Sequence, residues 1–326
     1  MKSYDVIVVG AGPVGLYAGF YAGMRGLSVA IIDVSEEAGG QPAEIYPEKA
    51  IYDIAGIPKI SGSALAQNLV QQLDKVDHDL RLGEKVERVV KTEAGFEVTT
   101  SQDVLTAKGL LLTTGNGQIV PRTLGVEGEE AAHAAGRLAY FVRDLESYRG
   151  KSVAVLGGGD SALDWALMLQ TVAREVHLVH RRDAFRAHEK TVEEVKASKI
   201  IIHTPYTAKE LMADGILLAK VKSEETLSLS VDRILVTYGF LTQPEALMEG
   251  LELNRNGRMR VDGTMASSIS GLYGAGDSVD YEGKIPLISV GFGEAVTAIS
   301  AMTRTIDFEK KLNAGHSSTL FEEEKV

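Results

Sequence analysis

The sequence predicts an α/β fold with two Rossmann-like domains, each built around a parallel β-sheet. Three observations support this prediction. The chain has 326 residues, which is enough for about two domains of roughly 100–200 residues each. A glycine-rich turn that follows an apolar run occurs twice, within residues 4–18 and 152–165. Apolar residues make up 44% and charged residues 24% of the sequence, which is typical of a globular protein and argues against disorder.

Two features of the composition exclude whole classes of function. The chain contains no cysteine, so it has no disulphide, redox dithiol, thiolate nucleophile or cysteine-ligated zinc or iron–sulfur cluster. Its net charge of −11 disfavours a sequence-independent grip on nucleic acid or on an anionic membrane, although a local basic patch remains open. We therefore predict no metal, no nucleic acid and no membrane among its ligands. Any redox chemistry must use a bound cofactor.

The first element is an uncharged stretch of 19 residues from Val6 to Met24. Its length alone would fit a membrane span or a signal peptide. It contains five glycines and Pro13, and its first half is β-branched, so a strand, a glycine turn and a packed helix explain it better. No A-x-A-like cleavage site follows it. We therefore expect a cytoplasmic protein with an intact N-terminus.

The glycine turns form an internal repeat. The two copies place small residues at the same three positions: Gly10, Gly12 and Gly15 in the first, and Gly157, Gly159 and Ala162 in the second, 147 residues later. Each turn leads through a helix to a second apolar strand, ending at Asp33 and at His180, which are again 147 residues apart. In dinucleotide sites the three positions allow a tight turn, a close approach of the pyrophosphate, and close helix packing. Two ligand-free tight turns are the alternative, and the shared register argues against it.

The residues after the second strands predict different nucleotides. The carboxylate of Asp33 can accept hydrogen bonds from a ribose diol and would repel a 2′-phosphate, so the first site suits FAD or NAD. The second copy has Arg181 and Arg182 after His180, with Arg186 one helical turn beyond. Three guanidiniums can clamp a phosphate, which predicts NADP, with Ser161 as a further contact. A solvated helix start is the alternative for the arginines.

A later segment favours FAD in the first site. An apolar run within residues 271–280 ends in G-A-G-D, so Asp277 would lie at the carboxyl end of a strand, where it can hold the ribityl hydroxyls. Residues 286–304 are predicted to form a buried helix whose N-terminus points to the flavin pyrimidine edge. The alternative is a glycine-rich helix cap in which Asp277 is already satisfied.

These motifs imply discontinuous domains. We predict an FAD-binding domain from residues 1–116 and 245–326, with an NADP-binding domain of residues 117–244 inserted in it. The junctions are the Gly- and Pro-containing stretches 115–121 and 238–244, and an apolar strand precedes each of them.

Together, the glycine turns, G-G-Q at 39–41, H-R-R-D-A-F-R-A at 180–187 and G-A-G-D at 274–277 resemble the thioredoxin-reductase-like two-dinucleotide flavoproteins. Thioredoxin reductases carry a C-x-x-C just before the second glycine turn, whereas residues 138–151 hold no cysteine. The chain resembles in detail the cysteine-free ferredoxin–NADP reductases of this fold, which are homodimeric bacterial enzymes. The matching stretches are 39–60, 156–169, 180–189, 281–295 and 316–321.

The resemblance implies roles for individual residues. They are Asp33 at the adenosine ribose, Gln41 at the flavin, Asp277 at the ribityl chain, Tyr46 on one flavin face, Val86 and Ile119 lining the FAD site largely through backbone, His316 over the other flavin face from the partner subunit, and Thr319 near FAD. From the residues alone, a Tyr in the position of Tyr46 is more often a packing residue, and a His in the position of His316 is more often part of a frayed tail. Two features depart from the family: Asp33 stands where Glu is common, and Ala43-Glu44 follows G-G-Q-P.

The implied activity is electron transfer between NADPH and ferredoxin or flavodoxin. Hydride passes to flavin N5 and electrons then leave singly, without acid or base catalysis by a side chain. Candidate docking cations are Lys49, Lys59, Arg143 and Arg149. Two alternatives stay open: an NADPH oxidase or a reductase of quinones or small iron complexes on the same fold, and a non-catalytic sensor that holds FAD and NADP(H).

Overall fold

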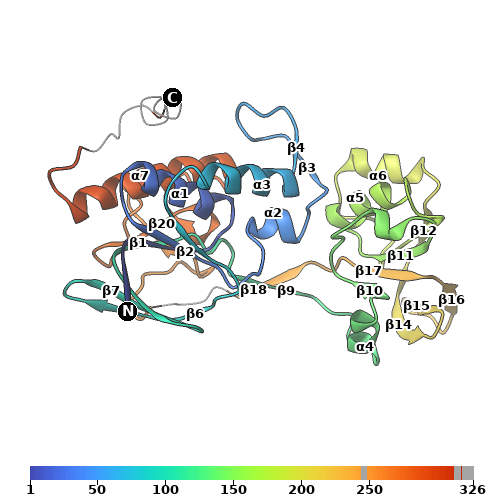
Figure 1. Ribbon diagram of the computed structural model, residues 1–326. Helices are drawn as coiled ribbons and strands as arrows, with labels where there is room; N and C mark the ends of the chain where they lie inside the picture. The colour runs from blue at the N-terminus through green and yellow to red at the C-terminus, as the bar shows by residue number, and fades with distance from the viewer. Residues whose placement is uncertain (244–247, 312–316, 318–326) are drawn as a thin grey trace. The chain divides into compact units, whose positions relative to one another are not determined.

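The computed structural model of the chain describes residues 1–243, 248–311 and 317. The chain divides into two compact units (Figure 1). The first unit comprises residues 1–118 and 242–326, and the second comprises residues 119–241. No helix among the described residues is long and apolar enough to cross a membrane.

The first unit is built on a largely parallel sheet with the strand order β5-β2-β1-β8-β7-β6, in which β20 also pairs with β8. The parallel strands are β1 (Lys2–Val9), β2 (Val29–Ile32), β5 (Asp79–Arg81), β8 (Val104–Leu112) and β20 (Leu272–Gly274). An antiparallel hairpin of β6 (Val86–Thr92) and β7 (Gly95–Thr100) joins β8. Because β1, β2, β8 and β20 are parallel, the loops that follow them meet at one edge.

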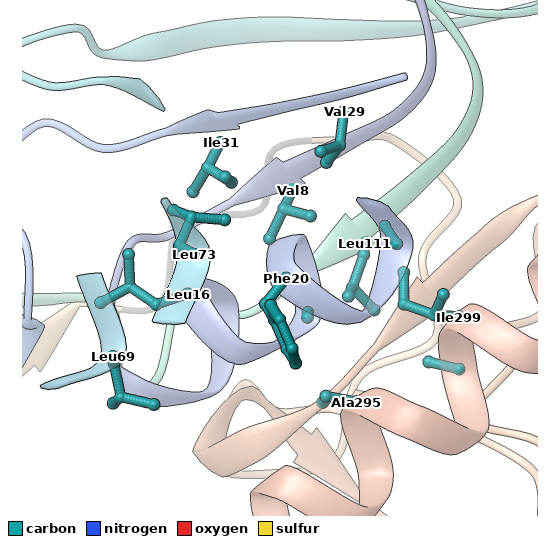
Figure 2. Close-up of a cluster of buried hydrophobic side chains, with 14 of the residues drawn as sticks. Val8, Leu16, Phe20, Val29, Ile31, Leu69, Leu73, Leu111, Ala295 and Ile299 are labelled. Carbon is teal, nitrogen blue, oxygen red and sulfur yellow. The ribbon is translucent and has the colours of Figure 1, made fainter. Parts of the chain in front are cut away.

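Alternating side chains of β1 serve two cores. Val6 and Val8 face α1 (Pro13–Met24), α3 (Gly62–Leu73) and α7 (Ile288–Ile306), whereas Ile7 and Val9 face the β6–β7 side. Figure 2 shows the helical core, with labelled side chains from Val8, Leu16, Phe20, Val29, Ile31, Leu69, Leu73, Leu111, Ala295 and Ile299. Each large apolar side chain buried in this way contributes about 1.5–3 kcal/mol. The uncharged N-terminal stretch is thus a strand, a turn and a core helix.

Short elements complete the first unit. They are α2 (Gly40–Glu44), the antiparallel pair β3 (Ala50–Ile51) and β4 (Ile60–Ser61), the parallel pair β19 (Met259–Arg260) and β21 (Val279–Asp280), and the 3₁₀ turn η2 (Gly276–Ser278). α2 packs on α3, and η2 packs on α7.

The second unit has a parallel sheet with the strand order β10-β17-β11-β12-β13. Its strands are β10 (Leu138–Ala139), β11 (Ser152–Leu156), β12 (Glu175–Val179), β13 (Ile201–His203) and β17 (Arg233–Val236). Val153 and Val155 pack under α5 (Asp160–Leu169) and α6 (Glu189–Lys196). Ala154 and Leu156 face the antiparallel sheet of β14 (Tyr206–Met212), β15 (Gly215–Lys220) and β16 (Thr226–Ser230).

Both units share one arrangement, which confirms the predicted fold class. In each, the strand before the glycine turn (β1 or β11) lies between the second strand (β2 or β12) and a later strand (β8 or β17). The remaining elements of the second unit are α4 (Glu129–Ala134) and η1 (Glu146–Tyr148). The chain passes between the units through β9 (Gln118–Pro121) and β18 (Phe240–Gln243), which pair with each other.

Candidate functional site

The two glycine turns make equivalent hydrogen bonds. The N–H of Gly10 donates to the carbonyl of Ile32 at 2.8 Å, and the N–H of Gly157 donates to the carbonyl of Val179 at 2.9 Å. Both turns therefore close on the last residue of the second strand. The internal repeat read from the sequence is a repeat in three dimensions.

Steric contacts give the glycines of each turn distinct roles. A Cβ on Gly10, whose φ is +109°, would lie 2.5 Å from the Thr113 carbonyl oxygen, and one on Gly15 would lie 1.8 Å from the Gly10 carbonyl oxygen. Both positions are closed by protein. A Cβ on Gly12 would meet nothing nearer than the Gly40 Cα at 4.0 Å, and one on Gly159 would meet nothing within 4 Å. The second glycine of each turn therefore faces open space, as the approach of a pyrophosphate requires.

Asp33 follows β2 and is fixed to the first glycine turn. Its Oδ2 accepts the N–H of Ala11 at 2.5 Å, and its Oδ1 accepts the N–H of Ser35 at 2.9 Å. The Ser35 hydroxyl donates to Glu44 on α2. The two departures from the resembled family, Asp33 and Glu44, are thus joined through Ser35. A carboxylate has about four acceptor sites, so Asp33 retains capacity for a ribose diol.

The G-G-Q segment packs directly on the same turn. The N–H of Gly39 donates to the Ala11 carbonyl at 2.8 Å, and a Cβ on Gly40 would lie 2.9 Å from the Gly12 Cα. Gly39 and Gly40 have φ values of +121° and +56°, which glycine adopts at low cost. Gln41 follows at the start of α2, and a Cβ on Gly115 would lie 3.6 Å from its Nε2.

Tyr46 lies within electrostatic range of Asp277, which is distant in the sequence. Burial raises the pKa of the half-buried Tyr46 phenol, and the charges of Asp277 and Asp53 raise it further. Asp277, in η2, accepts a hydrogen bond from Asn116 Nδ2 at 3.3 Å, and Asn116 Oδ1 in turn accepts one from Arg258 Nη2 at 3.2 Å. The phenol therefore stays neutral near neutral pH, and Asn116, held by Arg258, orients the Asp277 carboxylate that acts on it.

The other residues expected at the FAD site are placed as follows. Val86 begins β6 with its side chain buried, two residues after Glu84, whose N–H donates to the Asp33 carbonyl at 2.9 Å. Ile119 lies within β9. His316 and Thr319 lie outside the described residues, so their predicted roles stay predictions.

The predicted arginine clamp follows β12 in the second unit. Arg181, Arg182 and Arg186 are exposed, and none of them forms an ion pair with a residue in the described part of the chain. The expected helical turn between Arg182 and Arg186 is wrong. The chain bends at residues 181–184, and α6 begins only at Glu189. The N–H of Arg186 donates to the Gly158 carbonyl at 2.7 Å, and this bridge to the glycine turn holds the segment out of a helix.

His180 occupies the position in the second unit that Asp33 has in the first. Its ring lies against the glycine turn, since a Cβ on Gly158 would be 2.2 Å from its Nδ1. Burial lowers the pKa of His180, and the charges of Arg181, Arg182 and Arg186 lower it further. Its Nε2 is buried without a hydrogen-bond partner among the described atoms. Ser161 is exposed in the first turn of α5.

Comparison with known families identifies the class of protein. Residues 4–300 match the family described as pyridine nucleotide-disulphide oxidoreductase. The chain belongs to this family. The chain has no cysteine, so it cannot carry the dithiol that the family's name refers to.

Two full-length relatives of this pyridine nucleotide-disulphide oxidoreductase carry the name ferredoxin–NADP reductase. A ferredoxin–NADP reductase of Lactococcus lactis subsp. lactis is 56% identical over 98% of this chain and 100% of the relative. A ferredoxin–NADP reductase 2 of Bacillus pumilus is 44% identical over 98% of both chains. Among solved structures, the thioredoxin reductase of T. acidophilum matches with a TM-score of 0.75 and 27% identity, covering 94% of this chain and 99% of that one.

Sequence reasoning missed several polar residues that support these sites. Thr113 fastens the first glycine turn, Asn116 and Arg258 orient Asp277, and Glu294 receives a hydrogen bond from Gly276. Only Thr113 could have been found from the sequence, because a threonine follows the apolar strand in both copies, at 113 and at 237. The others depend on contacts between distant segments.

Proposed function

We propose that this chain is a ferredoxin–NADP reductase, an FAD-dependent oxidoreductase that moves electrons between NADPH and ferredoxin. One observation carries the proposal. Two equivalent glycine turns present opposite charge in a chain without cysteine: a carboxylate at Asp33 in the first unit, and in the second three guanidiniums that form no ion pair with any described residue. Two different nucleotides and no dithiol leave the flavin as the last redox centre.

The residues of the first unit fit FAD. Gly12 leaves room for a pyrophosphate, and Asp33 keeps free acceptor sites for the adenosine ribose. Gln41 and Tyr46 would meet the flavin, and Asp277 would hold the ribityl chain. We assign residues 1–116 and 245–326 to FAD binding and residues 117–244 to NADP binding.

The residues of the second unit fit NADP. Gly159 opens onto free space. Arg181, Arg182 and Arg186 form no ion pair within the described ranges, so their guanidiniums are available for a 2′-phosphate. The buried, unpartnered Nε2 of His180 also calls for a ligand atom, because a buried polar group without a hydrogen bond is costly. Gly157 and Ser161 would complete this site.

When bound, FAD supplies the exchange between a two-electron hydride donor and one-electron carriers. The protein binds and orients the nucleotides. Tyr46, with its raised pKa, offers a neutral aromatic face that stays protonated near neutral pH. No general acid or base from the chain is required.

The printed names of the relatives support ferredoxin as the carrier. Flavodoxin as a second carrier, a homodimer in which His316 covers the flavin of the partner subunit with Thr319 nearby, and a cytoplasmic location are proposals that rest on the family resemblance. Among the candidate docking cations, Arg149 is already held by Glu146 at 2.6 Å and 2.7 Å. Lys59 and Arg143 are exposed and are the better candidates.

The test is a coupled assay with purified holoenzyme. NADPH-driven reduction of cytochrome c is measured with ferredoxin, with flavodoxin, and without a carrier. We expect rapid reduction only when a carrier is present. Lys59→Ala and Arg143→Ala should raise the KM for ferredoxin and weaken its dependence on salt. A variant that leaves both quantities unchanged would remove its residue from the docking candidates.

The same assay separates the alternatives. An NADPH oxidase would consume oxygen at full rate without a carrier, and a quinone or iron-complex reductase would prefer those acceptors over ferredoxin. A non-catalytic sensor would bind both nucleotides and reduce no acceptor. Any of these outcomes would overturn the proposed function.

A further inference from the structure

A buried ionic cluster lies beside the segment that carries Asp277. Glu294 on α7 and Lys284 form an ion pair, Nζ to Oε1 at 2.5 Å, with side chains only 4% and 5% exposed. The Tyr281 hydroxyl donates to the same Oε1 at 2.6 Å. The N–H of Gly276 donates to Oε2 at 2.7 Å. Three donors thus converge on one carboxylate.

Stability alone does not account for this cluster. Burying two charges costs several kcal/mol, and an apolar pair of the same volume is often equally stable. The hydrogen bonds offset that cost, since both carboxylate oxygens are occupied. Burial and the contact with Glu294 raise the pKa of Tyr281 to about 12, so its hydroxyl remains a donor near neutral pH. The three donors to Glu294 share another property, which is their position in the sequence.

All three donors lie on one segment, residues 276–284, between the G-A-G-D turn and α7. One end of this segment bears Asp277, next to Gly276. The other end leads to the N-terminus of α7 at Ile288. Glu294 therefore fastens the segment to the helix that follows it.

Close packing fixes the same helix to the first glycine turn. A Cβ on Gly291 would lie 2.5 Å from Val14 of α1 and 3.5 Å from the Gly276 Cα. Ser278 fixes the G-A-G-D turn to the sheet, because its hydroxyl donates to the Leu112 carbonyl at 3.2 Å. The hydrogen bond from Gly276 to Glu294 is the third contact that fixes this region, and it is the one with a charged acceptor.

We propose that Glu294 is a positioning residue for FAD. It accepts the N–H of Gly276, and so sets Asp277 and the N-terminus of α7 at a fixed spacing before the cofactor binds. Lys284 balances its charge. This inference rests on the proposed function, because it assumes that Asp277 and α7 meet FAD.

Two double variants separate the hydrogen bonds that Glu294 accepts from its charge. In E294Q/K284M a glutamine oxygen can still accept the Gly276 N–H. In E294L/K284M no side-chain oxygen remains to accept the Gly276 N–H or the Tyr281 hydroxyl. Neither variant leaves a buried charge unpaired. We expect the apoproteins to melt within a few degrees of each other. FAD should bind E294Q/K284M within about threefold of wild type, and E294L/K284M about tenfold more weakly or worse.

Equal FAD affinity in the two double variants would overturn the inference. A second test needs no variant. Hydrogen exchange of residues 276–287 in the wild-type apoprotein should be slow, because the segment is already fastened, and fast exchange there would also overturn the inference. Failure of the wild-type chain to bind FAD would instead contradict the proposed function, so the two failures are distinguishable.

Discussion

Thr113 and Thr237, in different units, make the same hydrogen bond. The Oγ1 of Thr113 donates to the Val9 carbonyl at 3.0 Å, and the Oγ1 of Thr237 donates to the Leu156 carbonyl at 2.9 Å. Their backbone N–H groups donate to the same carbonyls, each at 2.8 Å. In both units, the threonine that follows the adjacent strand (β8 or β17) thus fixes the end of the strand that leads into the glycine turn.

Replacing these threonines by valine should weaken one nucleotide site at a time. Each change removes a buried or partly buried hydrogen bond at similar side-chain volume, which costs about 1–2 kcal/mol. We expect Thr113→Val to weaken FAD binding and leave the NADPH KM within about twofold of wild type. Thr237→Val should do the reverse. FAD titration and initial rates measure both, and parallel losses in the two variants would contradict separate sites.

The three glycines of a turn should respond differently to alanine. Gly159→Ala adds a Cβ that meets no protein atom within 4 Å, so it should raise the NADPH KM without lowering the melting temperature. Gly15→Ala places a Cβ 1.8 Å from a backbone carbonyl, so it should destabilise the first unit by several kcal/mol or prevent folding. A large drop in melting temperature for Gly159→Ala would argue against an open ligand space.

The arginines after β12 should determine the preference for NADPH over NADH. Replacing Arg181, Arg182 or Arg186 by alanine removes a charge-assisted contact to the 2′-phosphate, so the KM for NADPH should rise about tenfold while that for NADH hardly changes. Arg149→Ala is the matched control, since that guanidinium is paired with Glu146. If the KM values for NADPH and NADH rise equally, the arginines do not recognise the 2′-phosphate.

The second unit should lose stability in mild acid. Burial lowers the pKa of His180 and of His203 below the ordinary 6.5, with nearby Arg and His177 charges as further causes. The unfolded chain therefore binds more protons than the folded one below that value, and the free energy of unfolding falls as the pH drops. Trp165, the chain's single tryptophan, is buried in this unit and reports its unfolding by fluorescence.

We expect the melting temperature of the apoprotein, followed by Trp165 fluorescence, to decrease as the pH is lowered from about 7.5 to about 5.5. His203→Gln should reduce this fall, because it removes one of the two titrating rings, while Glu175 and His177 stay in place. His177 Nδ1 lies 3.0 Å from His203 Nε2, so glutamine can keep a hydrogen bond there. A melting temperature that is constant or rises over this range would refute the assignment.

The sequence was sufficient where structure follows from local pattern. The two strand–turn–helix units, and the long helix now seen as α7 (Ile288–Ile306), each depend on neighbouring residues, and all are confirmed. The helical turn expected at Arg186 failed because its N–H bonds to Gly158, a contact between segments. Local spacing cannot reveal such a contact.

Polar contacts between separate segments could not be predicted from the sequence either. Glu294 lies in a helix among small residues, where a charged side chain predicts an exposed position. It is buried, and residues 276–284 fold back to contact it. Glu44 seemed an unexplained departure from the family until Ser35 linked it to Asp33. Both pairings require the tertiary structure.

Anaerobic mixing of the FAD-loaded protein with NADPH is the decisive test of electron transfer from NADPH through FAD to ferredoxin. We expect flavin absorbance to bleach within seconds, NADH to act much more slowly than NADPH, and oxidised ferredoxin to restore the colour. A flavin that stays oxidised in NADPH, or that bleaches equally fast with NADH, would refute this electron transfer.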